Sequence, residues 1–330
     1  MTNVGRALAV LLSCSALGCG TSAAAPFSDA EQYAQYVTAG KQEAQHDLHD
    51  KADDLWQAVQ PQLAQLSAQQ QALWWVSRAD VLQFEHRFDE AIAALQNAYK
   101  QGHYRATIHL MQARIALTQA DTAAAQSACQ QLADYAPMDV TATCLLEVKG
   151  RNGELSSSYP VLKALHARNN DASSELSLWR RQLLAEQAHL LGAYDEALHW
   201  LQYRQYQQQP VVMQKQILEI LVTTQRAAEA LTIAGGCPTT NAIPVDSLIV
   251  RFAHAEQVSQ QSSCWRELAQ QRIDIRVLRG DRLHAADLAY YFTYVTADAD
   301  RALQWAQHNS DVAQEPFDQQ LLAAAKELQP

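Results

Sequence analysis

The chain has 330 residues, of which only 11 are glycine and 9 proline, and a formal net charge of −10. Its length allows one extended or two compact domains with a substantial buried core. The scarcity of Gly and Pro and the recurring runs of Ala, Leu, Gln and Glu favour helices and argue against a turn-rich β-sandwich or barrel. An acidic chain without a basic block also argues against nucleic-acid binding.

The first residues have the pattern of a secretory signal peptide. Arg6 is the one cation before an apolar stretch that starts at Ala7, and no acidic residue precedes Asp29. The stretch is too short to cross a bilayer, which needs about 20 apolar residues. Segment 1–18 is therefore predicted to direct export and to be removed.

The end of this segment resembles a bacterial lipobox. Residues 16–19 read Ala-Leu-Gly-Cys, although Ala16 stands where that motif usually has Leu. The resemblance implies that Cys19 becomes a lipidated N-terminus and that residues 19–28 form a tether. Because Gly20 rather than Asp follows the cysteine, the resemblance also implies a periplasmic, outer-membrane lipoprotein.

Two alternatives to this processing stay open. A second lipobox could end at Cys14, with a shorter apolar stretch before it. Ordinary cleavage after Ala24 or Ala25 would instead release a soluble periplasmic or secreted protein.

The remaining cysteines are Cys129, Cys144, Cys237 and Cys264. An even number in an oxidising compartment predicts two disulfides. Of the three possible pairings, the local one joins Cys129 to Cys144 and Cys237 to Cys264. The first two lie eight residues before and seven after Pro137, so two antiparallel helices would carry them at similar height. Buried free thiols are the alternative for each pair.

Beyond Ser28 the hydrophobic pattern is helical nearly throughout, without sustained strand alternation. Short helices with short connections are predicted to pack as antiparallel hairpins. One helix is expected over 246–258 and a closing helix from about 317 to 328. The predicted breaks between helices lie at 136–138, 150–158, 168–174, 235–245 and 279–281.

An internal repeat is the strongest signal in the chain. RFDEAIAAL at 87–95 matches AYDEALHWL at 193–201, and the helix before each carries an alanine, Ala79 or Ala185. The two copies lie 106 residues apart, which is three times 34 plus four. A weaker unit lies 34 residues after the first copy, with Ala113 in the place of Ala79. Self-similarity at such a period predicts stacked structural repeats.

This pattern resembles the tetratricopeptide repeat (TPR) family, whose hairpins have small residues where the first helix (helix A) meets the second (helix B). The unit around 139–166 is degenerate. The resemblance implies an all-α, right-handed α-solenoid of stacked antiparallel helix hairpins, because one hairpin cannot bury its apolar face alone. The chain is also similar to uncharacterised secreted or lipoprotein TPR proteins of Gram-negative bacteria. The fitting positions are Trp75, Ala79, Ala91, Leu95, Ala98, Ala113, Ala125, Cys129, Pro137, Ala185, Ala197, Leu201, Ala230, Ala234, Ala302 and Ala306.

Together these patterns predict five segments. Residues 1–18 are a signal peptide and 19–28 a tether. Residues 29–70 form N-terminal helices, 71–234 the TPR-like repeats, and 235–330 C-terminal helical hairpins with a capping helix.

The resemblance also implies a binding surface. In this family the exposed face of helix A contacts the ligand, and matching the units places Asp80, Arg114, Glu186 and Glu219 at one such position. Their mixed charges suit a polar protein or peptide partner. An ordinary solvated surface is the alternative.

A second functional hypothesis comes from a polar cluster near the N-terminus. His46, His49, Asp50 and Asp53 recur with helical spacing on one face. Imidazoles and carboxylates so placed could hold Zn²⁺ or Ni²⁺. The solvated face of an amphipathic helix is the preferred explanation, so no metal ligand is predicted.

The sequence therefore predicts an exported TPR-like scaffold that binds a protein or peptide in the bacterial envelope, without a cofactor and attached to the membrane only by its lipid. The alternative is a metal-handling accessory protein of the envelope. No enzyme is predicted, because HExxH, CxxC, GxGxxG and Walker motifs and any evident nucleophile–base pair are missing from the sequence.

Overall fold

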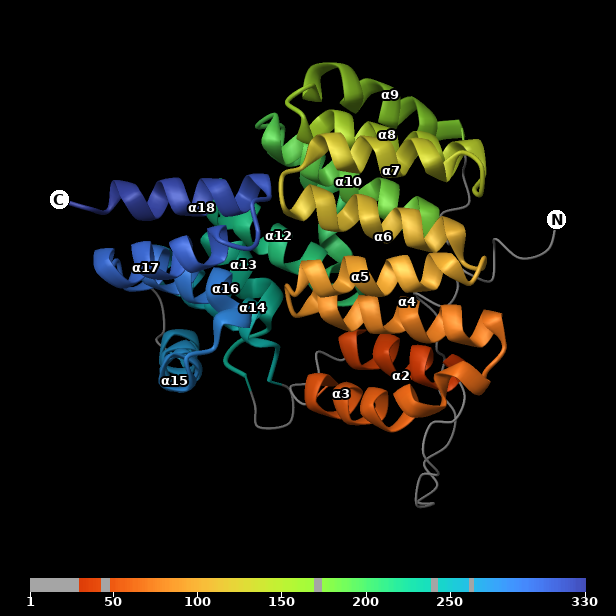
Figure 1. The fold of residues 1–330 in the computed structure, drawn as a ribbon. Helices are drawn as coiled ribbons and strands as arrows, with labels where there is room; N and C mark the ends of the chain where they lie inside the picture. Colours follow the sequence, from red (N-terminus) through yellow and green to blue (C-terminus); the bar gives the residue numbers. More distant parts are fainter. Residues whose placement is uncertain (1–29, 43–47, 169–173, 239–242, 261–263) are drawn as a thin grey trace. The chain divides into compact units, whose positions relative to one another are not determined.

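The computed structural model describes residues 30–42, 48–168, 174–238, 243–260 and 264–330. Within these ranges the protein is all-α, as the sequence predicts, and no strand is present (Figure 1). None of the helices in the described ranges combines the length and apolarity needed to span a membrane. The predicted signal segment, tether and Cys19 lie outside the described residues.

The described chain divides into two compact units. The first contains the described residues up to Leu117 together with Asp121–Val148. Figure 1 shows α4, α5, α6 and α7 of this unit as successive layers of antiparallel helices. Its helices are α2 (Ala30–Gln42), α3 (Leu48–Val59), the 3₁₀ helix η1 (Gln60–Gln65), α4 (Ala68–Phe84), α5 (Phe88–Lys100), α6 (Arg105–Thr118), α7 (Thr122–Leu132) and α8 (Met138–Arg151), which runs into the second unit.

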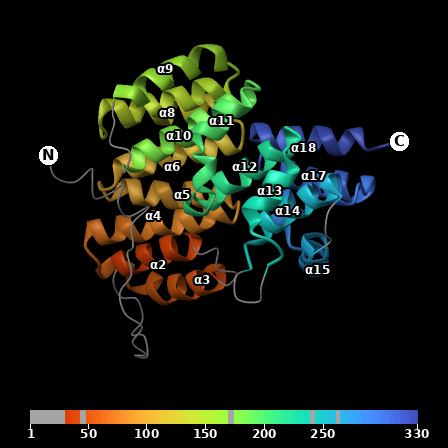
Figure 2. The ribbon, with the colours of Figure 1, turned by 180° about the vertical axis from the view of Figure 1, so that it is seen from behind.

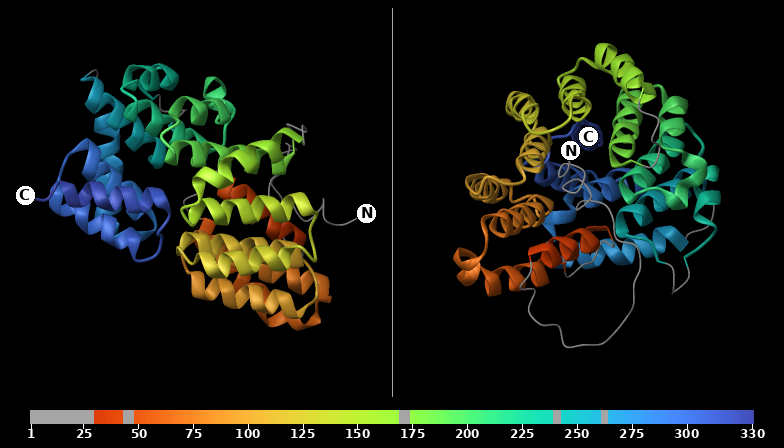
Figure 3. Two further views of the ribbon diagram at one scale, coloured as in Figure 1. Left: turned by 90° about the horizontal axis from the view of Figure 1, so that it is seen from above. Right: turned by 90° about the vertical axis from the view of Figure 1, so that its right-hand side faces the viewer.

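The second unit contains Thr118–Ala120 and the described part of Lys149–Pro330. Helices α10 and α11, α14 and α15, and α17 and α18 pack as neighbouring pairs (Figures 2 and 3). The helices are α9 (Leu155–Arg168), α10 (Glu175–Leu190), α11 (Tyr194–Trp200), η2 (Tyr203–Gln208), α12 (Val211–Thr223), α13 (Ala227–Ala234), α14 (Asp246–Ser259), α15 (Cys264–Arg279), η3 (Arg282–His284), α16 (Ala285–Tyr290), the π-helix η4 (Tyr291–Val295), α17 (Ala299–Ser310) and α18 (Pro316–Glu327).

Successive hairpins turn from helix A to helix B in the same way. A residue with positive φ follows helix A, and the next backbone N–H donates to the carbonyl five residues back, which is the Schellman arrangement. The N···O distances are 2.9 Å for Arg87 to Leu82, 2.8 Å for Asp121 to Ala116, 3.1 Å for Glu154 to Lys149, 2.9 Å for Ala193 to Ala188 and 2.7 Å for Arg226 to Leu221. The positive-φ residues are His86, Ala120, Gly153, Gly192 and Gln225. Because only two of them are glycine, glycine spacing does not reveal this repeat.

A small residue follows each turn at a fixed place in helix B. Its N–H donates to the carbonyl four residues back, and it is 0% exposed, in Ala91, Ala125, Ser158, Ala197 and Ala230. Ala302 has the same bond and burial in α17, after a turn whose hydrogen bond spans six residues. Ser158 holds this place in the unit around 139–166. The hairpin there is therefore regular, with serine in place of alanine.

Gly150 explains why the break predicted at 150–158 is too wide. This residue lies inside α8, which runs to Arg151, and α9 begins at Leu155. A Cβ at Gly150 would meet Gln187 Nε2 at 2.6 Å and Ser158 Oγ at 3.3 Å. The glycine thus permits a close approach of side chains and does not end the helix.

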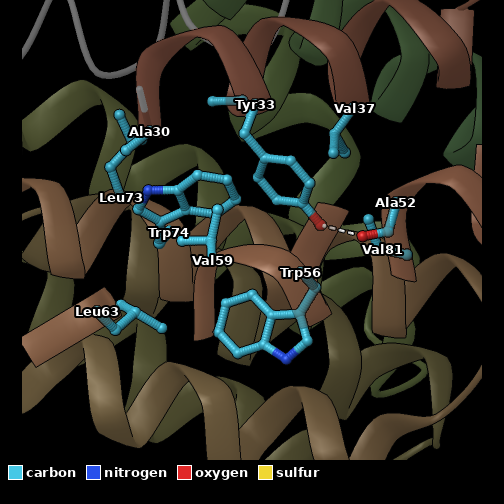
Figure 4. Packing of buried hydrophobic residues seen from close by; sticks show 11 residues of the cluster. Ala30, Tyr33, Val37, Ala52, Trp56, Val59, Leu63, Leu73, Trp74 and Val81 are labelled. Atoms are coloured by element: carbon cyan, nitrogen blue, oxygen red, sulfur yellow. Dashed lines mark hydrogen bonds between the residues drawn. The ribbon is translucent and has the colours of Figure 1, made fainter. Parts of the chain in front are cut away.

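The N-terminal helices pack onto α4 through an aromatic core (Figure 4). The rings of Tyr33 and Trp74 stack with their centroids 4.3 Å apart, and the Tyr33 hydroxyl donates to the Ala52 carbonyl oxygen over 3.3 Å. Trp56 lies 6.4 Å from Trp74, centroid to centroid. These contacts join α2, α3 and α4, and burial raises the pKa of Tyr33 well above its usual range.

Both predicted cysteine pairs are confirmed, because the two residues of each pair have the geometry of a disulfide. Each unit contains one of the pairs. The Cα atoms are 5.6 Å apart for Cys129 on α7 and Cys144 on α8. They are 5.9 Å apart for Cys237, just after α13, and Cys264 at the start of α15. These separations fall in the range of about 4.4–6.8 Å that disulfides require.

Candidate functional site

Two of the predicted binding positions lie in the first unit. Asp80 on α4 is buried, and its carboxylate accepts a hydrogen bond of 2.9 Å from Gln83 Nε2. Arg114 on α6 is exposed. The two residues thus differ in burial, although the repeat match gives them the same place.

The other two positions, in the second unit, form ion pairs with neighbouring helices. Glu186 Oε1 on α10 lies 2.6 Å from Arg151 Nε, and Glu219 Oε1 on α12 lies 2.9 Å from Arg251 Nε. The side chains of these glutamates are 13% and 18% exposed. The expected exposure is therefore wrong for Asp80, which is buried, and for the two glutamates, because their face of helix A contacts a neighbouring helix. Partner binding through these four residues stays a prediction.

Buried arginines with carboxylate partners recur along the chain, and sequence reasoning missed them. Arg78 pairs with Asp53, and Arg276 Nη2 lies 2.6 Å from Asp246 Oδ2. Arg276 also pairs with Asp281. Burial alone would raise the pKa of Asp281, but the His284 and Arg276 side chains outweigh it and lower this pKa to about 2. For Arg151 and Glu186, which are 35 residues apart, the available signal was a pair of opposite charges about one repeat apart.

Of the hypothetical metal cluster, only the Asp53 side chain is described, and its carboxylate pairs with Arg78. His46 and the side chains of His49 and Asp50 lie outside the described residues. Elsewhere in the described chain, no three His, Cys, Asp or Glu side chains gather closely enough to hold a metal ion.

A cavity of about 510 Å³ lies in the second unit, lined by α9, α10, α11 and η2. Gln202, with φ of 50°, turns the chain from α11 into η2 at the edge of this cavity. No ligand-binding motif in the sequence marks this place, because its lining residues come from separate helices. The lining residues that carry its chemistry are His166, Arg181, Asp195, Trp200, Tyr203 and Arg204.

Arg181 is the half-buried cation of the cavity. Its Nε donates to the Trp200 carbonyl oxygen over 3.1 Å, and its Nη2 donates to Gln209 Oε1 over 3.0 Å. Both acceptors are neutral, and burial lowers the pKa of Arg181. Among the residues that the structure describes, Arg181 has no carboxylate partner, unlike Arg151 or Arg251.

His166 lies beside Arg181 in the cavity lining. Its ring meets the Trp200 ring edge-on with the centroids 5.4 Å apart, and its Nδ1 is buried without a hydrogen-bond partner in the described chain. Burial, and then the charges of Arg180 and Arg181, lower the pKa of His166. The imidazole is therefore neutral near pH 7.

No protein-family model matches this chain, and no curated protein matches it either. The functional proposals below accordingly rest on the sequence patterns and on the geometry just described.

Proposed function

We propose that the protein is an exported TPR-like scaffold that binds a protein or peptide partner in the bacterial envelope. The observation that carries this proposal is the recurring hairpin junction. The same turn is followed by a fully buried small residue at Ala91, Ala125, Ser158, Ala197 and Ala230. Hairpins of one design that cannot bury their apolar faces alone form solenoids by stacking, here proposed as right-handed and TPR-like. Solenoids of this kind present extended binding surfaces.

The proposed location is the periplasm, with a lipid at Cys19 anchoring the protein to the outer membrane. The signal-like segment 1–18 and the cysteine pairs support export, because disulfides persist in oxidising compartments. The variant Cys19→Ala should shift the protein from the membrane to the soluble fraction, whereas Cys14→Ala should leave it in the membrane. A wild-type protein that fractionates as soluble and carries no acyl group would contradict the lipid anchor.

Arg114 on α6 is the predicted contact residue whose exposure agrees with a binding role. We therefore test the proposal by capturing partners from envelope extracts with wild-type protein and with Arg114→Glu. Lys100→Glu, which reverses an exposed charge on α5 of the same unit, is the matched control. We expect the proteins that the wild type captures to be lost with Arg114→Glu and to be retained with Lys100→Glu. Equal capture by both variants would refute this binding surface.

The role proposed is binding and not catalysis. The alternative of a metal-handling accessory gains no support from Asp53, whose carboxylate already pairs with Arg78. Titration of the purified protein with Zn²⁺ or Ni²⁺ distinguishes the two functions, since the scaffold requires no metal to bind its partner.

A further inference from the structure

The cavity lined by α9, α10, α11 and η2 has the size and chemistry of a small-molecule site. Its volume of about 510 Å³ falls within the range of about 300–1,000 Å³ that is typical of ligand pockets. It lies wholly in the second unit and includes none of the four positions predicted for partner binding. Its function can therefore be argued separately from the proposed scaffold role.

Arg181 gives the cavity an uncompensated positive charge. Its described hydrogen bonds engage Nε and one proton of Nη2, so both protons of Nη1 and the second proton of Nη2 remain for an acceptor. This free edge of the guanidinium matches the two oxygens of a carboxylate. Asp195 does not neutralise it, because the Asp195 side chain is 99% exposed and lies 3.6 Å from Arg226.

The rest of the lining favours an anion with a flat body. Arg204 adds an exposed cation to the half-buried Arg181. The half-buried Trp200 ring offers a flat apolar surface, and its Nε1–H is already used in a 2.9 Å hydrogen bond to the Tyr159 hydroxyl.

We propose that this cavity binds a small organic acid, whose carboxylate pairs with Arg181 and whose flat body lies against the Trp200 ring. The inference assigns a small-molecule site to the protein in addition to its proposed macromolecular partner, and it holds whether or not that partner exists.

The test is a titration of the purified protein, followed by the indole N–H signal of Trp200 in nitrogen-15 correlation spectra. Trp200→Phe assigns this signal among the 7 tryptophans. Benzoate is the probe, benzamide is its neutral counterpart of the same shape, and phenyl phosphate is the dianionic counterpart. We expect benzoate to shift the signal saturably and to bind about tenfold or more tightly than benzamide, because a charge-assisted pair is lost with the amide.

Variants locate the site. Arg181→Gln should weaken benzoate binding by about tenfold or more. Arg282→Gln, an exposed arginine of the same unit outside the cavity, should leave binding unchanged. Circular dichroism checks that Arg181→Gln is folded, and the comparison of benzoate with benzamide on the wild type stands if it is not.

Several results would overturn the proposal. They are no saturable shift with benzoate at millimolar concentrations, equal affinity for benzamide, and unchanged affinity in folded Arg181→Gln. Tighter binding of phenyl phosphate than of benzoate would overturn the assignment of a carboxylate ligand.

Discussion

Single residues on helix A stabilise the fold through ion pairs with neighbouring helices. Glu186 meets Arg151, and Glu219 meets Arg251, which also pairs with Asp287. A buried charge that loses its partner is costly, even where the intact pair contributes little. Side chains that a repeat match assigns to a binding surface therefore act first as links between helices.

Replacing Glu186 tests this role. In Glu186→Ala, Arg151 loses the carboxylate that lies 2.6 Å from its Nε and keeps its pair with the more exposed Glu315, at 3.2 Å. The free energy of unfolding should fall by about 1–3 kcal/mol, measured by urea denaturation. Lys326→Ala, an exposed change on α18, should alter it by less than about 0.5 kcal/mol. A neutral effect of Glu186→Ala would show that its ion pair is dispensable.

His254 makes stability depend on pH. Its Nδ1 shares a 2.7 Å hydrogen bond with the Tyr290 hydroxyl, and its ring stacks on Tyr294 at 5.0 Å. Burial, and then the nearby Arg251 charge, lower its pKa from 6.5 to about 4, although Glu219 opposes the shift. Between these two values the unfolded chain binds a proton that the native state does not, so stability falls as the pH falls through this window.

This group alone should therefore cost about 2 kcal/mol of stability on going from pH 7 to about pH 5. The variant His254→Gln removes the titrating group, so its loss over the same range should be smaller by that amount. Urea midpoints of both proteins at the two pH values measure the difference. Parallel pH dependences of variant and wild type would contradict the assignment.

At the scale of the element, the turn between helix A and helix B is the repeated unit. Gly192, with φ of 74°, and Ala120, with φ of 59°, hold the same left-handed position in different hairpins. A Cβ on Gly192 would meet no atom within 4 Å, so substitution there changes only the backbone energy. Gly192→Ala should therefore destabilise by about 1 kcal/mol.

The reverse change is its matched control. Ala120→Gly relieves the left-handed strain at the cost of greater chain entropy in the unfolded state, so its stability should equal or exceed that of the wild type. Thermal unfolding of both variants checks the pair. A destabilised Ala120→Gly would contradict the assignment of a left-handed turn there.

The small residue after each turn sets how closely the two helices approach. Ala197 is fully buried, and a larger side chain there cannot fit without moving a helix. Ala197→Leu should lower the free energy of unfolding by about 1–3 kcal/mol, measured by urea denaturation. Ala323→Leu, at an exposed site on α18, should be tolerated. Equal stability of the two variants would refute the packing role of Ala197.

At the scale of the whole molecule, each compact unit holds one disulfide. Peptide mapping without reduction should link Cys129 to Cys144 and Cys237 to Cys264. The first pair closes a loop with a sequence separation of 15, so opening it should destabilise by about 3 kcal/mol in the chain-entropy model. The variant Cys129→Ser/Cys144→Ser measures this loss. Four alkylatable thiols in the native protein would contradict both bridges.

The sequence by itself determined the features that depend on local or periodic information. Helical periodicity predicts an all-α chain, the predicted helix at 246–258 corresponds to α14, and the closing helix corresponds to α18. The symmetric spacing about Pro137 pairs Cys129 with Cys144. These features depend on residues within about one hairpin of each other, where spacing alone fixes which side chains can meet.

Only the tertiary structure decided which side chains from separate hairpins meet. The direction of Glu186 depends on Arg151, which lies 35 residues before it on another helix. Gly150 suggests a helix break in the sequence, but in the structure the Gln187 side chain occupies the space that a Cβ at Gly150 would need. The neutral partners of Arg181 likewise come from α11 and from the end of η2. Helical periodicity specifies which face of a helix is buried, but the partner across that face is chosen by the packing of helices that are distant in the chain.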